Sequence, residues 1–177
     1  MAIYHLAAQI ITRSHGRCAT AAAAYRAGQK LTDERTGLTF NYSRKKEVAY
    51  RRIIAPKHAP EWVYDRQALW SAVEMTEKRR DAQLCREIHV SLPHELTLVQ
   101  QTRLIETFVI TQFVRNGMIA DVAIHSKAGN CHAHVMLTMR DISAIGFGPK
   151  RRDWNAVEEL EIWRSKWASH TNRKLTA

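Results

Sequence analysis

Three histidines in the last third of the chain have the types and spacing of metal ligands: His125, His132 and His134. His132 and His134 are two residues apart in a strand-like segment, so their side chains share one face. Residues 118–126 are also strand-like, and the turn-prone sequence KAGN joins the two segments. An antiparallel hairpin of this kind brings His125 beside the other two. Each histidine alone is more typical of a partly exposed strand residue, but their convergence favours a metal site with open positions.

A second strand-like segment could reach the same site. Residues 84–92 alternate in polarity, with Leu84, Ile88, Val90 and Leu92 on one side and Cys85, Glu87, His89 and Ser91 on the other. Glu87 and His89 could therefore orient a ligand or accept a proton, although Glu87 is equally typical of a surface carboxylate. A metal held only by histidines keeps its full positive charge, which suits an anionic substrate such as a phosphodiester.

The nucleophile of such a site does not follow from these residues. The chain has no GxSxG, HExxH or catalytic-cysteine pattern. Its three cysteines, Cys18, Cys85 and Cys131, are far apart, which predicts reduced thiols rather than disulfides or a metal knuckle. Water would give hydrolysis and a side chain would give a covalent intermediate, and spacing does not choose among the five tyrosines.

Length and charge limit the functional classes. A chain of 177 residues is close to one ordinary domain. Its 27 Lys and Arg exceed its 17 Asp and Glu, so nucleic acid or an acidic membrane surface is the expected partner. No apolar run approaches the roughly 20 residues that cross a bilayer, and the start does not resemble a secretory signal. These features predict a cytoplasmic protein without a transmembrane anchor.

The remaining pattern predicts the elements that must position the histidines. Strands are expected at 3–11 and 48–55, and helices at 18–31, at 61–80, from Thr97 to Phe113 and from Asp153 onward. Thr97 and Gln100 form a capping-box pattern, and Gly117 stands where that helix could end. We expect the tryptophans of the last helix to be core residues rather than a base-stacking platform.

Several segments together resemble a known family. These are MAIYHLAAQIITRSHGRCATAAAAYRAGQKL, REIHVSLPHELT, AIHSKAGNCHAHVMLTMR and the closing WNAVEELEIWRSKWASHTNRKL. In this order they are similar to the motifs of MobA/MobL (TraA-like) conjugative relaxases, in the HUH endonuclease superfamily, over nearly the whole chain.

By position, the resemblance implies that Tyr25 is the nucleophile, that His125, His132 and His134 bind the catalytic metal, and that Glu87 is an acidic residue of the active site. Two positions depart from the family pattern. Cys131 stands where members often have proline, and is a conceivable soft ligand although it should point away. His89 stands where members often have a second acidic residue, which leaves the identity of the general base open.

The resemblance also implies a function. A metal-dependent relaxase nicks plasmid DNA at the origin of transfer through a 5'-phosphotyrosyl intermediate and rejoins it, initiating conjugative transfer or mobilisation in a bacterium. The family suggests Mn²⁺ or Mg²⁺, whereas histidine ligands would also accept Zn²⁺, Ni²⁺ or Co²⁺. Expected partners are single-stranded or hairpin DNA, accessory relaxosome proteins and a coupling protein. Candidate DNA-binding cations are Arg13, Arg17, Arg26, Arg151 and Arg152.

We therefore expect one α/β (α+β) domain over residues 1–177, possessing a two-layer sandwich with a mainly antiparallel sheet of about five strands. Helices should pack chiefly on one face and the metal should bind on the other. Related relaxases often continue into further C-terminal regions, so this chain could be the N-terminal part of a longer protein. The alternatives are an HUH nickase of rolling-circle replication, which the early position of the tyrosine disfavours, and a non-catalytic basic DNA-binding module.

Overall fold

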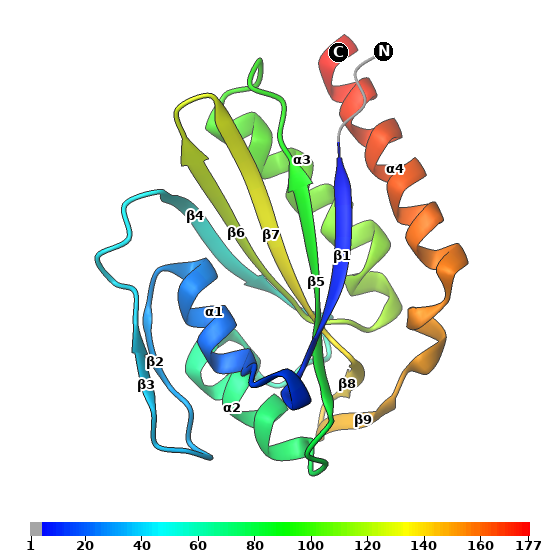
Figure 1. Ribbon diagram of the computed structural model, residues 1–177. Helices are drawn as coiled ribbons and strands as arrows, with labels where there is room; N and C mark the ends of the chain where they lie inside the picture. Colours follow the sequence, from blue (N-terminus) through cyan, green and yellow to red (C-terminus); the bar gives the residue numbers. More distant parts are fainter. Residues whose placement is uncertain (1–4) are drawn as a thin grey trace.

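A five-stranded antiparallel sheet forms the centre of the computed structural model, which describes residues 5–177 (Figure 1). The spatial order is β1-β5-β7-β6-β4, and every neighbouring pair is antiparallel. The strands are β1 (Leu6–Thr12), β4 (Val48–Ile54), β5 (Gln83–Ser91), β6 (Ala120–Lys127) and β7 (Asn130–Thr138). This confirms the expected sheet; residues 3 and 4 of the predicted first strand lie outside the described residues.

Helices cover the two faces of this sheet unequally. The helices are α1 (Ala19–Ala27), α2 (Arg66–Thr76), α3 (Leu98–Gln112) and α4 (Val157–Thr176). The longer pair, α3 and α4, covers one face, while α1 and α2 pack over one end of the other (Figure 1). Part of that second face is therefore left for a site beside α1.

Short elements connect the larger ones. They are the hairpin β2 (Lys30–Thr32) and β3 (Thr39–Asn41), the hairpin β8 (Arg140–Ser143) and β9 (Gly146–Lys150), and the 3-10 turns η1 (Arg13–His15), η2 (Glu61–Tyr64), η3 (Val114–Asn116) and η4 (Arg152–Asn155). Within residues 5–177, no helix has both the length and the apolar character needed to cross a membrane.

Alternation along the strands separates the core from the site. Ala133, Val135 and Leu137 of β7 are fully buried and pack with α3 and α4. His132 and His134 must then project from the opposite face. Ile88 and Val90 of β5 and Leu92, just after it, join the same core, but Leu84, expected beside them, packs in the second cluster with α1 and α2.

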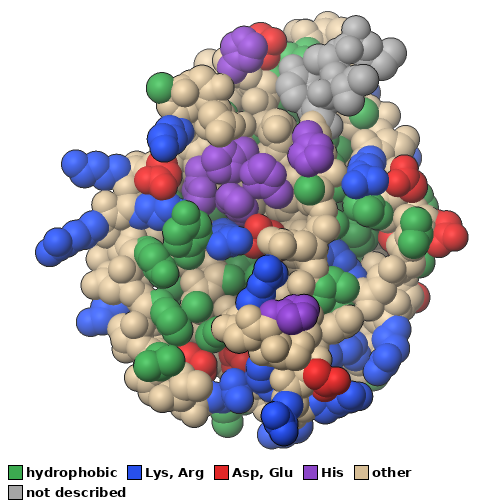
Figure 2. Space-filling model, viewed as in Figure 1, with side chains coloured by type: hydrophobic (Ala, Val, Ile, Leu, Met, Phe, Trp, Pro, Cys, Tyr) green, Lys and Arg blue, Asp and Glu red, His purple; other side chains and the backbone are tan. Residues whose placement is uncertain are grey.

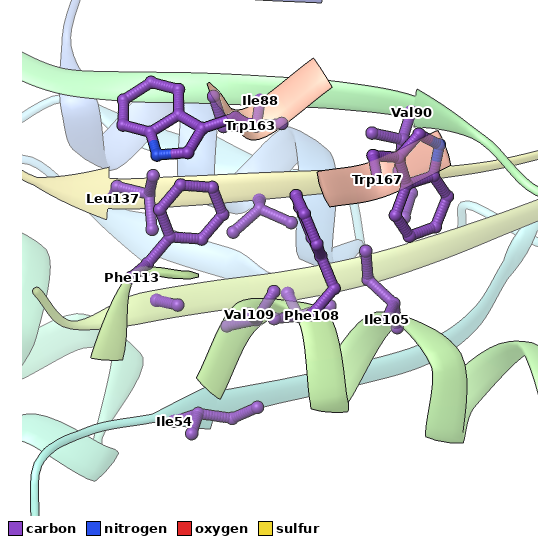
Figure 3. Close-up of a cluster of buried hydrophobic side chains, with 14 of the residues drawn as sticks. Ile54, Ile88, Val90, Ile105, Phe108, Val109, Phe113, Leu137, Trp163 and Trp167 are labelled. Atoms are coloured by element: carbon purple, nitrogen blue, oxygen red, sulfur yellow. The ribbon is translucent and has the colours of Figure 1, made fainter. Parts of the chain in front are cut away.

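Aromatic side chains join α3 and α4 over the sheet (Figure 3). The ring of Phe108 lies 5.0 Å from that of Trp167, and the ring of Phe113 lies 5.1 Å from that of Trp163, both edge to face. Such pairs add to the large apolar area that each ring buries. The tryptophans are core residues, as the sequence predicts.

Local signals place the helix boundaries with mixed success. The capping box of Thr97 and Gln100 begins α3 as predicted. Gly28, in the left-handed conformation at φ 62°, ends α1 well before residue 31. Gly117 caps η3 rather than α3. The prediction that Asp153 caps the last helix is wrong: Asp153 lies in η4 and pairs with Arg151 at 2.8 Å, and α4 begins at Val157.

We expect Phe108→Ala to lower the free energy of unfolding by about 3–5 kcal/mol, because it leaves a cavity between α3 and α4. Urea denaturation measures this change. The matched control is Ile145→Ala, at a position 99% exposed, which should change the free energy by less than about 0.5 kcal/mol. Equal effects of the two substitutions would contradict the described packing.

Candidate active site

Four histidines converge on the face of the sheet that carries α1. The β6–β7 hairpin pairs His125 with His132, and the pairing of β5 with β7 sets His89 opposite His134. Ring centroids within this group lie 4.7 Å apart for His125 and His134, and 5.1 Å apart for His132 and His134. Figure 2 shows histidine side chains gathered on this face, with Lys and Arg side chains close by. The predicted hairpin therefore brings its three histidines together, and β5 adds a fourth.

The ring nitrogens distinguish two sets among these histidines. Ligand atoms of His89, His132 and His134 all lie within 4.8 Å of one another. His125 instead bonds through Nε2 to the backbone oxygen of Arg26, at 2.7 Å. A carbonyl only accepts, so Nε2 carries the proton and Nδ1 is the nitrogen of His125 with a free lone pair.

Burial keeps these rings in the neutral form that a metal requires. It is the main cause that lowers the pKa of His89 to about 4, helped by the positive charges that His134 and His132 can carry. Burial also lowers the pKa of His125 to about 4, although the hydrogen bond to Arg26 opposes the change. The pKa of His132 is lowered mainly by burial as well. Near neutral pH, these three imidazoles have lone pairs to offer.

Glu87 is a buried carboxylate that joins two elements of the site. Its side chain is 4% exposed, pairs with the Arg26 guanidinium at 2.8 Å and contacts Nδ1 of His134 at 3.2 Å. Burial raises its pKa, but the hydrogen bond with His134 and the charge of Arg26 outweigh this and lower the pKa to about 2. An ionised carboxylate only accepts, so His134 donates through Nδ1, and Nε2 is its nitrogen that can bind a metal.

Tyr25 lies on the last turn of α1, and the residue is 43% exposed. The next residue, Arg26, ties this turn to the histidines twice, through its carbonyl to His125 and through its guanidinium to Glu87. The other end of α1 is also anchored, because the Ala19 amide donates to the buried Glu74 carboxylate at 2.6 Å. The last turn of α1, which carries Tyr25, is thereby held against the histidine cluster through Arg26.

The predicted DNA-binding arginines lie in unlike settings. Arg13 is mostly buried against Glu74, and Arg151 pairs with Asp141 and Asp153. Arg26 holds Glu87, as described above. Arg17 and Arg152 are exposed and make no ion pair with any described residue. The structure thus gives three of the five a role in holding protein elements together.

Sequence reasoning placed His89 only in a supporting position, whereas its nitrogen lies with those of His132 and His134. Its signal was the alternation that set it on the polar face with Glu87. Cys131 packs against the apolar cluster on the opposite face, as its position in the alternation predicts. The ion pair between Arg26 and Glu87 had no local signal, because 61 residues separate the partners.

Comparison with known proteins identifies similar sequences. Residues 17–177 match the MobA/MobL family. The chain is 38% identical over 161 residues to the conjugal transfer protein TraA of Agrobacterium fabrum, an alignment that covers 85% of this chain and 15% of that protein. It is 42% identical over 172 residues to the mobilization protein MobL of Acidithiobacillus ferridurans, covering 82% of this chain and 45% of MobL. The chain therefore spans less than half the length of these relatives.

Two solved structures share the fold. One, from work titled "Molecular Basis of Vancomycin Resistance Transfer in Staphylococcus aureus", superposes with a TM-score of 0.93 at 32% identity, covering 99% of this chain and 93% of the other. The other is the metal-bound conjugative relaxase TrwC in complex with oriT DNA, with a TM-score of 0.63 at 11% identity, covering 97% of this chain and 70% of TrwC. At that identity, TrwC supports the fold alone.

Replacing Glu87 tests the link between α1 and the histidines. Glu87→Gln keeps the shape but removes the charge, so we expect the free energy of unfolding to fall by about 1.5–3 kcal/mol. Mn²⁺ affinity, measured by the EPR signal of the free ion, should fall about 10-fold, because His134 loses its charged partner. Glu161→Gln, in an exposed pair with Arg164, is the control and should change neither quantity. If Glu87→Gln has the stability and the Mn²⁺ affinity of the parent protein, Glu87 does not link α1 to the histidines.

Proposed function

Since the chain belongs to the MobA/MobL family of conjugative relaxases and mobilisation proteins, we propose that it nicks plasmid DNA at the origin of transfer with Tyr25 as the nucleophile. The observation that carries this proposal is the double tie from Arg26 to His125 and Glu87. It ties the residue next to Tyr25 to the histidine cluster, and Tyr25 itself is 43% exposed. A nucleophile beside a group of metal ligands is the arrangement that phosphodiester transfer needs.

The proposed reaction is a transesterification. The phenol oxygen of Tyr25 attacks the scissile phosphorus in line, the bond from phosphorus to the 3' oxygen breaks, and a 5'-phosphotyrosyl enzyme and a free 3'-hydroxyl result. Attack by that hydroxyl in the reverse direction rejoins the strand. Because the pKa of Glu87 is about 2, its carboxylate is a weak base, and we assign it to holding His134 rather than to taking the proton of Tyr25.

The histidine cluster fits a divalent metal. Ligand atoms of His89, His132 and His134 lie within 4.8 Å of one another, and burial lowers the pKa of His89 and His132, so neutral ring nitrogens are available to a metal. We propose His125, His132 and His134 as the ligands, with His89 as the fourth imidazole at the same site. A bound Mn²⁺ or Mg²⁺ would neutralise charge on the scissile phosphate in the transition state.

The substrate that we propose is single-stranded or hairpin DNA from an origin of transfer. The net charge of +10 supports a polyanionic partner, and TrwC, which shares the fold, was solved with oriT DNA. Exposed Arg17 and Arg152 are candidates for phosphate contacts. Accessory relaxosome proteins and a coupling protein are proposed partners on the basis of family membership.

Cleavage is tested with labelled single-stranded oligonucleotides that tile the DNA around the protein's own gene, in the presence of Mn²⁺. We expect a covalent adduct that peptide mass mapping places on Tyr25. Tyr25→Phe should form no adduct, because it lacks the attacking oxygen. Tyr64→Phe is the control at a similarly exposed tyrosine and should react like the parent. Undiminished cleavage by Tyr25→Phe would refute the mechanism, and DNA binding without any cleavage would favour a non-catalytic module.

Metal dependence is tested on the same reaction and by direct binding. We expect EDTA to abolish cleavage and excess Mn²⁺ to restore it. In EPR titrations, His132→Ala and His134→Ala should each weaken Mn²⁺ binding by about 10–100-fold. His125→Ala and His89→Ala identify the third ligand. If, of these two, only His89→Ala strongly weakens Mn²⁺ binding, His89 rather than His125 is the third ligand. Unchanged affinity in all four variants would remove the metal site.

A further inference from the structure

The segment after β3 folds back onto the last turn of α1. The Tyr42 amide donates to the Gln29 carbonyl at 3.1 Å, and the Lys45 amide donates to the Tyr42 carbonyl at 3.0 Å. Gly28 allows this approach: a Cβ at Gly28 would lie 3.6 Å from the Tyr42 oxygen and 3.0 Å from Val48. The β2–β3 hairpin thus returns the chain, and the segment that follows β3 lies against Tyr25.

Two side chains of this segment contact the ring of Tyr25. The ring of Tyr42 meets it edge to face, with centroids 5.1 Å apart. The ammonium of Lys45 lies over its face, 3.4 Å from the centroid, and also donates to the Tyr25 carbonyl at 3.0 Å. One ammonium thus holds both the ring and the backbone of the same residue, which restricts the direction of the phenol.

The charge of Lys45 is only partly neutralised. Its side chain is 10% exposed, and its nearest carboxylate, Glu47, is 3.8 Å away and itself 40% exposed. The ammonium and the histidine cluster contact adjacent residues of α1, because Lys45 donates to the Tyr25 carbonyl and His125 donates to the Arg26 carbonyl. Lys45 therefore places a positive charge over the ring of Tyr25, next to the residue that bonds to His125.

We propose that Lys45 is a positioning residue for the nucleophile: it clamps Tyr25 against Tyr42 and keeps a positive charge beside the path of attack. This rests on the proposed function of Tyr25. In the reaction, an electron pair of the phenol oxygen forms the bond to phosphorus, and the pair of the breaking bond leaves with the 3' oxygen. Solvent takes the phenol proton and supplies one to the 3' oxygen, while Lys45 remains an ammonium throughout. Its charge stabilises the negative charge that passes through the transition state.

The clamp itself is tested without DNA. The protein is labelled with 3-fluorotyrosine, and the ¹⁹F resonance of residue 25 is identified by its loss in Tyr25→Phe. We expect Lys45→Met to shift this resonance and Lys45→Arg to restore most of the parental position, because a guanidinium also stacks on an aromatic ring. Lys46→Met, which removes the same charge from the exposed neighbouring position, should leave the resonance in place. A resonance that Lys45→Met does not move overturns the clamp, whether or not the protein cleaves DNA.

The kinetic consequence is measured as the single-turnover rate of adduct formation at saturating oligonucleotide. Lys45→Met should lower this rate by about 10–100-fold, because a small misplacement of a nucleophile is costly. In the Tyr25→Phe background, Lys45→Met should change DNA affinity by less than about 3-fold, because at most one phosphate contact is lost. Lys45→Arg should recover part of the rate, and Lys46→Met should keep it within about 2-fold.

The outcomes are distinguishable. A parental rate in Lys45→Met, with melting temperature unchanged, overturns the kinetic proposal. A loss confined to affinity, equal in Lys45→Met and Lys46→Met, would make Lys45 an ordinary phosphate-binding lysine and also overturns it. Absence of an adduct with the parent protein is a failure of the proposed function, and the ¹⁹F measurement still decides whether Lys45 clamps Tyr25.

Discussion

The buried charge of Glu87 is the constraint on which the site depends. A carboxylate that is 4% exposed needs compensating partners, and it finds them in Arg26 on α1 and His134 on β7. Because β5 carries Glu87, one side chain couples three elements that are far apart in the chain. Satisfying this charge sets the position of the last turn of α1 and the orientation of a metal-ligand candidate together. The position of Tyr25 is a consequence of the same interaction.

The antiparallel sheet separates stability from chemistry by its two faces. One face is closed by α3 and α4 around fully buried residues such as Ile88 and Val135, so its strands cannot shift register without exposing apolar surface. The same register fixes the positions of the residues on the other face, which carries the histidines. His89, His132 and His134 are thus held in place by the core on the opposite face, and burial lowers the pKa of His89 and His132.

Family membership and geometry support each other at different levels. The match over residues 17–177 establishes a MobA/MobL relaxase fold, and the 32% identical structure superposes on nearly the whole chain. The geometry adds what membership alone does not: Glu87 is an ionised partner of His134, Arg26 belongs to the site rather than to a free cationic surface, and His89 joins the imidazoles. These contacts place His89 as a fourth imidazole beside His132 and His134.

Features governed by neighbours in sequence were predictable from the residues alone. Alternation assigned the faces of β6 and β7, the capping box began α3, and the turn at Gly129 produced the hairpin that pairs His125 with His132. Contacts between segments far apart in the sequence could not be predicted, because no local pattern encodes them. The Arg26–Glu87 pair, the burial of Arg13 against Glu74 and the placement of Lys45 over Tyr25 all arise when separate elements pack. The sequence pattern around a charged residue does not show whether its side chain faces water or a buried partner. Only the packing of the sheet and helices decides between these two environments.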